Sequence, residues 1–197
     1  MRSMRFVLLR KLMHLAMAWL LAVGWWSSYQ RELALAGVFL AASLVVEVAR
    51  RRWQWIDHLL WHVLPSVFRA GEKRRIFGST WFAVGALATL LLFGRDTGGT
   101  AVLFLAWGDP MAELVGRRWG RPGQRKTLAG SLGCLLACLL AAGVGIGLGG
   151  LSPVMALTGA VVATLVERRS PPPDDNVWLP ILSGLAMWAV EQIPHLF

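Results

Sequence analysis

The residues best suited to chemistry lie in one stretch, residues 107–131, which reads WGDPMAELVGRRWGRPGQRKTLAGS. Asp109 and Glu113 are four residues apart, so they share one face of a helix. Carboxylates can hold a divalent cation, and guanidinium and ammonium groups can hold phosphate. Such bases follow the two acids directly, at Arg117, Arg118, Arg121, Arg125 and Lys126. The stretch therefore predicts a phosphoryl-transfer site.

Glycines are interspersed among these charges, at Gly108, Gly116, Gly120, Gly123 and Gly130. A glycine allows the backbone to come close to a phosphate ester, because it has no side chain. Five bases alone would fit a solvated loop at a lipid surface equally well. Their contiguity with Asp109 and with the glycines favours phosphate binding.

The elements that must position this stretch are membrane helices. Of the 197 residues, 56% are hydrophobic and only 16% are charged, against roughly 25% in a soluble domain. The mean hydropathy is +0.54, and the apolar residues form long blocks. We therefore expect an all-α, polytopic integral membrane protein that forms a single domain over residues 1–197.

The apolar blocks predict seven transmembrane helices, over residues 8–26, 33–49, 78–93, 100–115, 132–148, 154–166 and 177–193. Residues 53–68 instead place Trp55, Leu59 and Val63 at helical spacing, which predicts an interfacial helix. Residues 95–99 read as a turn. The pairs Gly143/Gly147 and Gly145/Gly149 predict close helix contacts.

The formal charge of +9 raises the question of nucleic acid. The bases, however, sit mainly in clusters between the apolar blocks, as in cytosolic membrane loops. Only Arg31 and Arg95 fall on the opposite side of the predicted seven-helix topology. We therefore expect a lipid bilayer and no nucleic acid as partner, with the N-terminus in the cytosol and the C-terminus outside.

Several candidate residues also have a purely structural interpretation. Asp109 would lie inside the bilayer or in a pocket open to the cytosol, where a carboxylate is costly unless it is paired or functional. Glu113 could pair with Arg117 at the i,i+4 spacing, which is at least as well supported as a metal role. Glu47 could simply pair with Arg51.

His58 and His62 have the i,i+4 spacing of metal ligands. No third ligand is placed near them by the sequence, so the interfacial helix is the better interpretation.

Several short motifs occur together along nearly the whole chain. They comprise Lys11 with His14, Glu47 with Arg50, Glu72 with Gly78, Gly108-Asp109-Pro110, Gly116-Arg117-Arg118 with Gly120, Lys126-Thr127, Gly130-Ser131, Glu167, and Asp175-Asn176 with Pro180. In this order they resemble the CTP-dependent lipid-alcohol kinases: dolichol kinase, phytol kinase, yeast-type diacylglycerol kinase and their bacterial relatives. In size the chain is most similar to the phytol kinase branch. The residue at the Glu113 position is small in that family, so Glu113 is not carried over as a ligand.

The resemblance implies transfer of the CTP γ-phosphoryl group to the hydroxyl of a membrane lipid alcohol. It implies roles for the motif residues: Mg²⁺ binding by Asp109 and Asp175, charge neutralisation by Arg117, Arg118 and Lys126, nucleotide contacts by Gly130, Ser131 and Asn176, and acceptance of the alcohol proton by Glu47, Glu72 or His14. It also implies the inner membrane of a bacterium, with the active site facing the cytosol.

Two other classes of function remain as alternatives. A phosphatidate-type cytidylyltransferase would form a CDP-lipid and also uses a Gly-Asp motif followed by bases. A lipid transporter or membrane assembly protein would need no metal. The acceptor is left open among phytol, another prenol, a polyprenol and diacylglycerol, and so is the oligomeric state.

Overall fold

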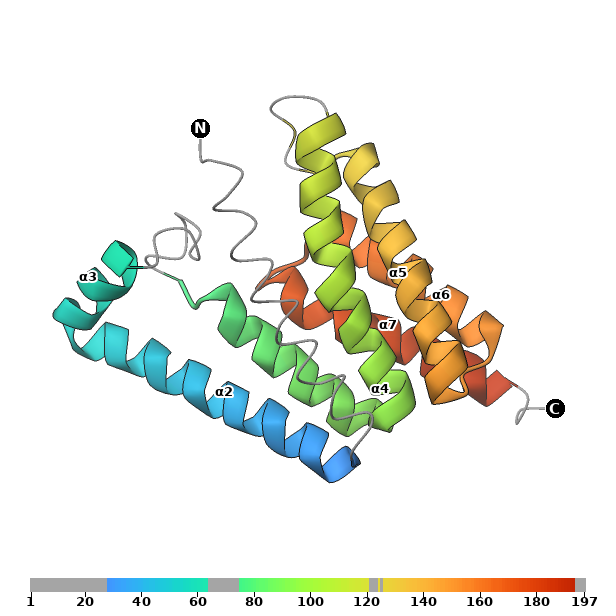
Figure 1. Ribbon diagram of the computed structural model, residues 1–197, viewed down its shortest axis with the longest axis horizontal. Coiled ribbons are helices and arrows are strands. Elements are labelled where there is room, and N and C mark those ends of the chain that lie inside the picture. The colour runs from blue at the N-terminus through green and yellow to red at the C-terminus, as the bar shows by residue number, and fades with distance from the viewer. Residues whose placement is uncertain (1–27, 64–74, 121–123, 125, 194–197) are drawn as a thin grey trace.

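A computed structural model describes residues 28–63, 75–120, 124 and 126–193 (Figure 1). The described residues form six helices and no strand: α2 (Tyr29–Arg52), α3 (Gln54–Val63), α4 (Gly78–Trp119), α5 (Leu128–Gly149), α6 (Pro153–Arg169) and α7 (Asp175–Gln192). The predicted all-α class is therefore confirmed. The expected first span over residues 8–26, with Lys11 and His14, lies outside the described residues, as does Glu72.

Three of these helices, α2, α4 and α5, are long and apolar enough to cross a membrane. Large apolar side chains remain exposed along them, including Val45 on α2, Leu92 on α4 and Leu140 on α5. Such side chains suit hydrocarbon better than water. The chain is thus an integral membrane protein.

Helix α4 bends sharply at Gly94, the residue at which its two halves meet (Figure 1). Gly94 has φ 73° and ψ −167°, a conformation that glycine adopts without a steric penalty. The predicted turn over residues 95–99 was wrong, because those residues are already helical and the Thr100 hydroxyl donates to the Asp96 carbonyl at 2.7 Å. The chain reverses at one residue instead of five.

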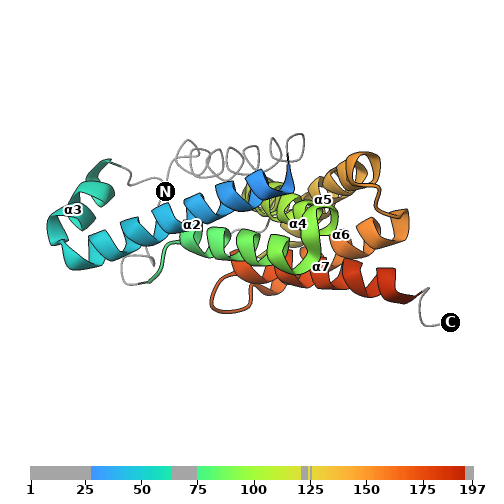
Figure 2. The same ribbon diagram turned by 90° about the horizontal axis from the view of Figure 1, so that it is seen from below.

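The bend is packed tightly and is tied to α2. A Cβ on Gly98 would lie 2.9 Å from the Thr89 carbonyl oxygen, so the two halves of α4 approach through glycine. Arg95 Nε lies 3.7 Å from Glu32 Oε2 on α2. Figure 2 shows the first half of α4 beside α2 and the second half near α5.

Small residues determine how closely the other helices pack. A Cβ on Gly85 would lie 2.4 Å from the Asn176 carbonyl oxygen, which brings the start of α7 against α4. A Cβ on Gly145 would lie 2.5 Å from Thr100 Oγ1, in line with the predicted helix contact there. Gly143 and Gly147 have no heavy atom of another element within 4 Å of the Cβ position, so the contact predicted for that pair was wrong.

Helix α3 begins one residue later than the predicted interfacial segment and is described as far as Val63. None of its residues is buried, and Trp55, Leu59 and Val63 are all more than half exposed. This exposed apolar face is the one that the helical spacing predicted.

Candidate active site

The polar centre of the molecule is Lys126, in the connection between α4 and α5. Its Nζ donates to Glu167 Oε1 at 2.6 Å and to Asp175 Oδ2 at 3.1 Å. Glu167 lies in the last turn of α6, and Asp175 is the first residue of α7. Both carboxylates are buried, at 5% and 6% side-chain exposure, whereas the Lys126 side chain is 26% exposed. Three separate helix ends therefore meet at one ammonium group.

Asp109 belongs to the same cluster. It lies in the second half of α4 and is 5% exposed. Burial by itself would lower the pKa of Lys126, but Asp175, the hydrogen bond to Glu167, and the charges of Glu167 and Asp109 outweigh burial and raise this pKa. Lys126 is therefore charged at neutral pH. Asp109, Lys126, Glu167 and Asp175 are called the Lys126 cluster below.

The connection between α6 and α7 holds Asp175 in place. Ser170, at the C-cap of α6, donates its hydroxyl to Asp175 Oδ2 at 2.7 Å. Asp174 caps α7 by accepting from the Asn176 backbone N–H at 3.1 Å.

The Asn176 side chain joins the start of α7 to the start of α4. Its Nδ2 donates to the Gly78 carbonyl at 3.1 Å. Its Oδ1 is buried and accepts no hydrogen bond within the described residues. A buried carboxamide oxygen of this kind is normally satisfied, so this atom is available to a ligand or a cation.

The glycines of the motif allow the start of α5 to pack closely on α4. A Cβ on Gly120 would lie 2.5 Å from Thr127 Cγ2, and one on Gly130 would lie 2.7 Å from the Ala112 carbonyl oxygen. A Cβ on Gly108 would lie 2.8 Å from Cys138 Sγ. Gly116, 3.0 Å from Thr127 Oγ1 by the same measure, belongs to the same contact. These positions therefore serve packing that brings Lys126 towards Asp109.

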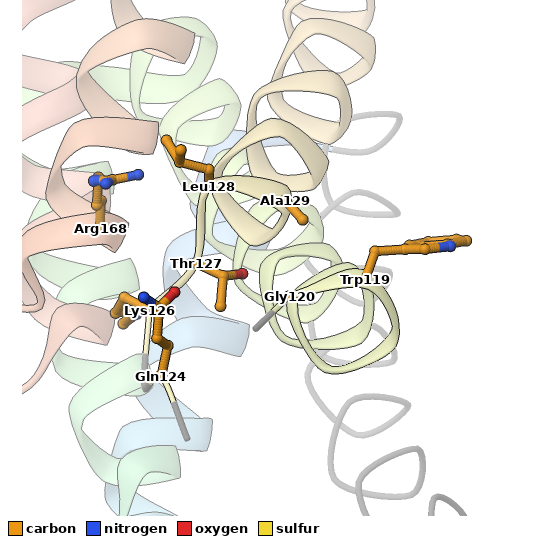
Figure 3. Close-up of a pocket in the computed structure, with 8 residues that line it drawn as sticks. All are labelled: Trp119, Gly120, Gln124, Lys126, Thr127, Leu128, Ala129 and Arg168. Carbon is orange, nitrogen blue, oxygen red and sulfur yellow. The ribbon is translucent and has the colours of Figure 1, made fainter. Parts of the chain in front are cut away.

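A pocket of about 370 Å³ opens beside Lys126 at the start of α5 (Figure 3). It is lined by Trp119, Gly120, Gln124, Lys126, Thr127, Leu128, Ala129 and Arg168. Arg168 is a lining residue that the sequence analysis missed. Its Nη1 donates to the hydroxyl of Ser131 at 3.3 Å, which brings this predicted nucleotide contact next to the pocket. The only sequence signal was its position directly after Glu167.

Arg117 and Arg118 are placed differently from Lys126. Arg117 donates to Glu113 Oε1 through Nε at 3.0 Å and Nη2 at 2.8 Å, the i,i+4 pair weighed from the sequence. The Arg118 guanidinium lies 5.9 Å from the centre of the Trp119 ring. Neither lines the pocket, although both lie within one helical turn of it.

A second buried cluster surrounds Glu47 near the end of α2. The Glu47 carboxylate accepts four hydrogen bonds: from Arg50 Nε at 3.1 Å, from Arg50 Nη2 at 2.6 Å, from Arg51 Nε at 2.7 Å and from the Phe77 backbone N–H at 3.3 Å. Arg50 also lies 3.6 Å from Asp57 Oδ1 and 3.9 Å from the centre of the Phe77 ring. Glu47, Arg50, Arg51 and Asp57 are called the Glu47 cluster below.

The described residues contain no group of three or more His, Cys, Asp and Glu side chains arranged to hold a metal ion. This applies to His58 and His62 on α3 and also to the Lys126 cluster. Any metal there would need ligands from the substrate as well as from the protein.

The chain is similar to several curated kinases. It is 31% identical to the phytol kinase of Synechocystis sp. over 196 aligned residues, which cover 91% of this chain and 78% of that enzyme. It is 32% identical to the CTP-dependent diacylglycerol kinase 1 of Schizosaccharomyces pombe over 94 residues, 46% of this chain and 43% of that enzyme. With the corresponding enzyme of Saccharomyces cerevisiae it shares 26% identity over 172 residues, 74% and 59% of the two chains.

No protein-family model and no solved structure matches the chain. The match to the phytol kinase nevertheless extends over most of both proteins. The motifs quoted above include all four members of the Lys126 cluster, and the structure gathers them at one site. The chain belongs to the family of CTP-dependent lipid-alcohol kinases.

Proposed function

We propose that this protein transfers the γ-phosphoryl group of CTP to the hydroxyl of a membrane lipid alcohol at the Lys126 cluster. The observation that carries the proposal is the meeting of Lys126 with Glu167 and Asp175, which are 41 and 49 residues further along the chain. Their convergence beside Asp109 and an open pocket is the arrangement expected of a phosphoryl-transfer site.

In the proposed reaction the lipid hydroxyl oxygen attacks the γ-phosphorus. The bond from the γ-phosphorus to the β–γ bridging oxygen breaks, and CDP leaves with that bonding electron pair. The alcohol proton passes to an acceptor on the protein or to water. Lys126, which remains charged, neutralises negative charge that builds on the phosphate oxygens.

The Lys126 cluster suits a divalent cation. Its three carboxylates face one ammonium group, which leaves an excess of two formal negative charges that one Mg²⁺ would balance. Asp109 and Asp175 would hold the ion, and the buried Asn176 Oδ1 offers a further oxygen of the type that Mg²⁺ prefers. Mg²⁺ commonly uses only one or two protein carboxylates together with substrate phosphates. When bound, it would bridge phosphate oxygens and offset their charge.

The acceptor of the alcohol proton is proposed among His14, Glu72 and Glu47. Glu47 already accepts four hydrogen bonds, two of its donors being guanidinium groups. A carboxylate so engaged is a poor base, because its charged form is stabilised. His14 and Glu72 are therefore the stronger candidates.

The proposed membrane arrangement keeps seven spans, an interfacial helix α3, a cytosolic N-terminus and an external C-terminus, in the inner membrane of a bacterium. The bend at Gly94 supports two crossings by α4, one on each side of that residue. The basic loops support a cytosolic location for the Lys126 cluster. CTP would then reach the pocket from the cytosol, and the lipid hydroxyl would reach it from the bilayer.

The test is a panel of radiolabelled nucleotides and lipid alcohols with the purified protein in nanodiscs. CTP, ATP and UTP labelled at the γ-phosphate are each combined with phytol, a polyprenol and diacylglycerol, with empty nanodiscs as the control. We expect label in a lipid phosphate, preferentially from CTP, together with an equal amount of CDP.

Two outcomes of the panel would contradict the proposal. Release of pyrophosphate with formation of a CDP-lipid would assign the chain to the cytidylyltransferases. Absence of turnover with every pair would favour a lipid transporter or a membrane assembly protein.

A further inference from the structure

The pocket beside the Lys126 cluster contains a cation that the proposed mechanism has not used. Lys126 and Arg168 both line it, and they approach the start of α5 from the side of α6 (Figure 3). The Trp119 side chain points away on the opposite side (Figure 3). The two cations thus face one open space of about 370 Å³.

The two cations differ in their partners. Lys126 is held by two buried carboxylates. Arg168 has one hydrogen bond, at 3.3 Å, to the neutral hydroxyl of Ser131, and forms no ion pair within the described part of the chain. A guanidinium group carries five N–H donors, so most of the donors of Arg168 remain for another acceptor. Planar, forked donors of this kind bind phosphate oxygens through two hydrogen bonds at once.

The first turn of α5 adds to the positive character of the same pocket. Thr127 Oγ1 accepts from the Gly130 backbone N–H at 3.0 Å, which satisfies one of the amides that lack an acceptor within the helix. Leu128 and Ala129, the first two residues of the helix, line the pocket. Their position at a helix N-terminus favours an anion in front of Arg168.

The depths of the two cations suggest the direction in which a triphosphate would lie. Lys126 is mostly buried and touches the carboxylates, whereas Arg168 is exposed at the edge of the pocket. The transferred phosphate must lie near Asp109 and Lys126 if the chemistry occurs there. The rest of the phosphate chain would then extend outward past Arg168.

We propose that Arg168 binds the phosphates that stay with the departing nucleoside diphosphate, an assignment that rests on the proposed function. Arg168 would contribute to binding of both the triphosphate substrate and the diphosphate product. It would contribute little to the stabilisation that arises only in the transition state.

The test compares Arg168→Ala with Arg169→Ala, a control at the same helix end whose residue does not line the pocket. We expect Arg168→Ala to raise the KM for CTP and the Kd for CDP in parallel, by about 10- to 100-fold, with kcat within about threefold of the native value. Arg168→Lys should recover part of the affinity. Arg169→Ala should leave all three constants unchanged, and equal melting temperatures would establish that both variants fold.

The outcomes separate this assignment from the proposed function. Native Kd for CDP in Arg168→Ala, with normal turnover by the unmodified protein, would overturn the assignment alone. A large fall in kcat with unchanged CDP binding would also overturn it, since Arg168 would then contact the transferred phosphate. Weaker CDP binding by Arg168→Ala, when the unmodified protein has no kinase activity, would support the diphosphate site and contradict the proposed reaction.

Discussion

Two buried charge clusters in this protein, one around Glu47 and one around Lys126, differ in how their charges balance. The Glu47 cluster has two carboxylates and two guanidinium groups, and the Glu47 carboxylate accepts four hydrogen bonds. The Lys126 cluster has three carboxylates around one ammonium group. The first is complete within the protein, and the second carries an excess of negative charge.

Burying unbalanced charge is costly, so a fold built only for stability would avoid it. A site that must bind cations can retain such an excess, because the ligand supplies the missing positive charge. The contrast therefore indicates that Glu47 secures α2 to the start of α4, whereas the Lys126 cluster is arranged for a ligand. Substitutions that change one charge without changing shape can test this difference.

The largest effect is expected for Asp109→Asn. The substitution keeps the size of the side chain and removes one of the excess negative charges. We expect turnover with CTP to fall by about 100-fold or more, while the melting temperature in detergent stays level or rises. Turnover at the native rate would show that Asp109 holds no cation during the reaction.

A different balance of effects is expected for Glu47→Gln. Arg50 is buried, with 3% side-chain exposure, and would lose the charge that compensates it. We expect a loss of about 3–5 kcal/mol in the free energy of unfolding, measured by denaturant titration in detergent. Turnover per folded molecule should fall far less than in Asp109→Asn. A variant of native stability without activity would instead identify Glu47 as the acceptor of the alcohol proton.

The smallest effect is expected for Glu113→Ala. Its partner Arg117 has 48% side-chain exposure, so the i,i+4 ion pair is screened by solvent. We expect a loss of about 0.5 kcal/mol or less from this pair, read as a small shift in melting temperature, and turnover within about twofold of native. A tenfold fall in turnover would place Glu113 among the cation ligands after all.

Local rules predicted the local features of this structure. The 3.6-residue period indicated the exposed face of α3, and i,i+4 spacing indicated the pair of Glu113 with Arg117. The same kind of rule failed at residues 95–99. A run of polar residues and glycines is typical of a turn, but here the hydroxyl of Thr100 bonds within the helix and Gly98 faces the other half of α4.

The long-range part of the site could not be derived from spacing. Nothing in residues 107–131 says that Lys126 meets Glu167 or Asp175, since that depends on how α6 and α7 pack. Only the resemblance to the kinase family linked those residues beforehand. Arg168 escaped attention because a base beside a predicted helix end is expected at any cytosolic loop, and only the packing of α6 beside α5 brings it to the pocket.

The bend at Gly94 gives the molecule two lever arms of similar length. Asp109 lies 15 residues after Gly94 and Gly78 lies 16 residues before it, so each arm is roughly 22–24 Å long. A rotation of about 10° at that bend would carry Asp109 by roughly 4 Å, more than the length of a hydrogen bond. No atom of another element lies within 4 Å of the position of a Gly94 Cβ, so its backbone angles alone demand glycine there. The distance between Asp109 and the Asn176 contact with Gly78 is therefore set in part at the far end of the protein, by a residue with no side chain.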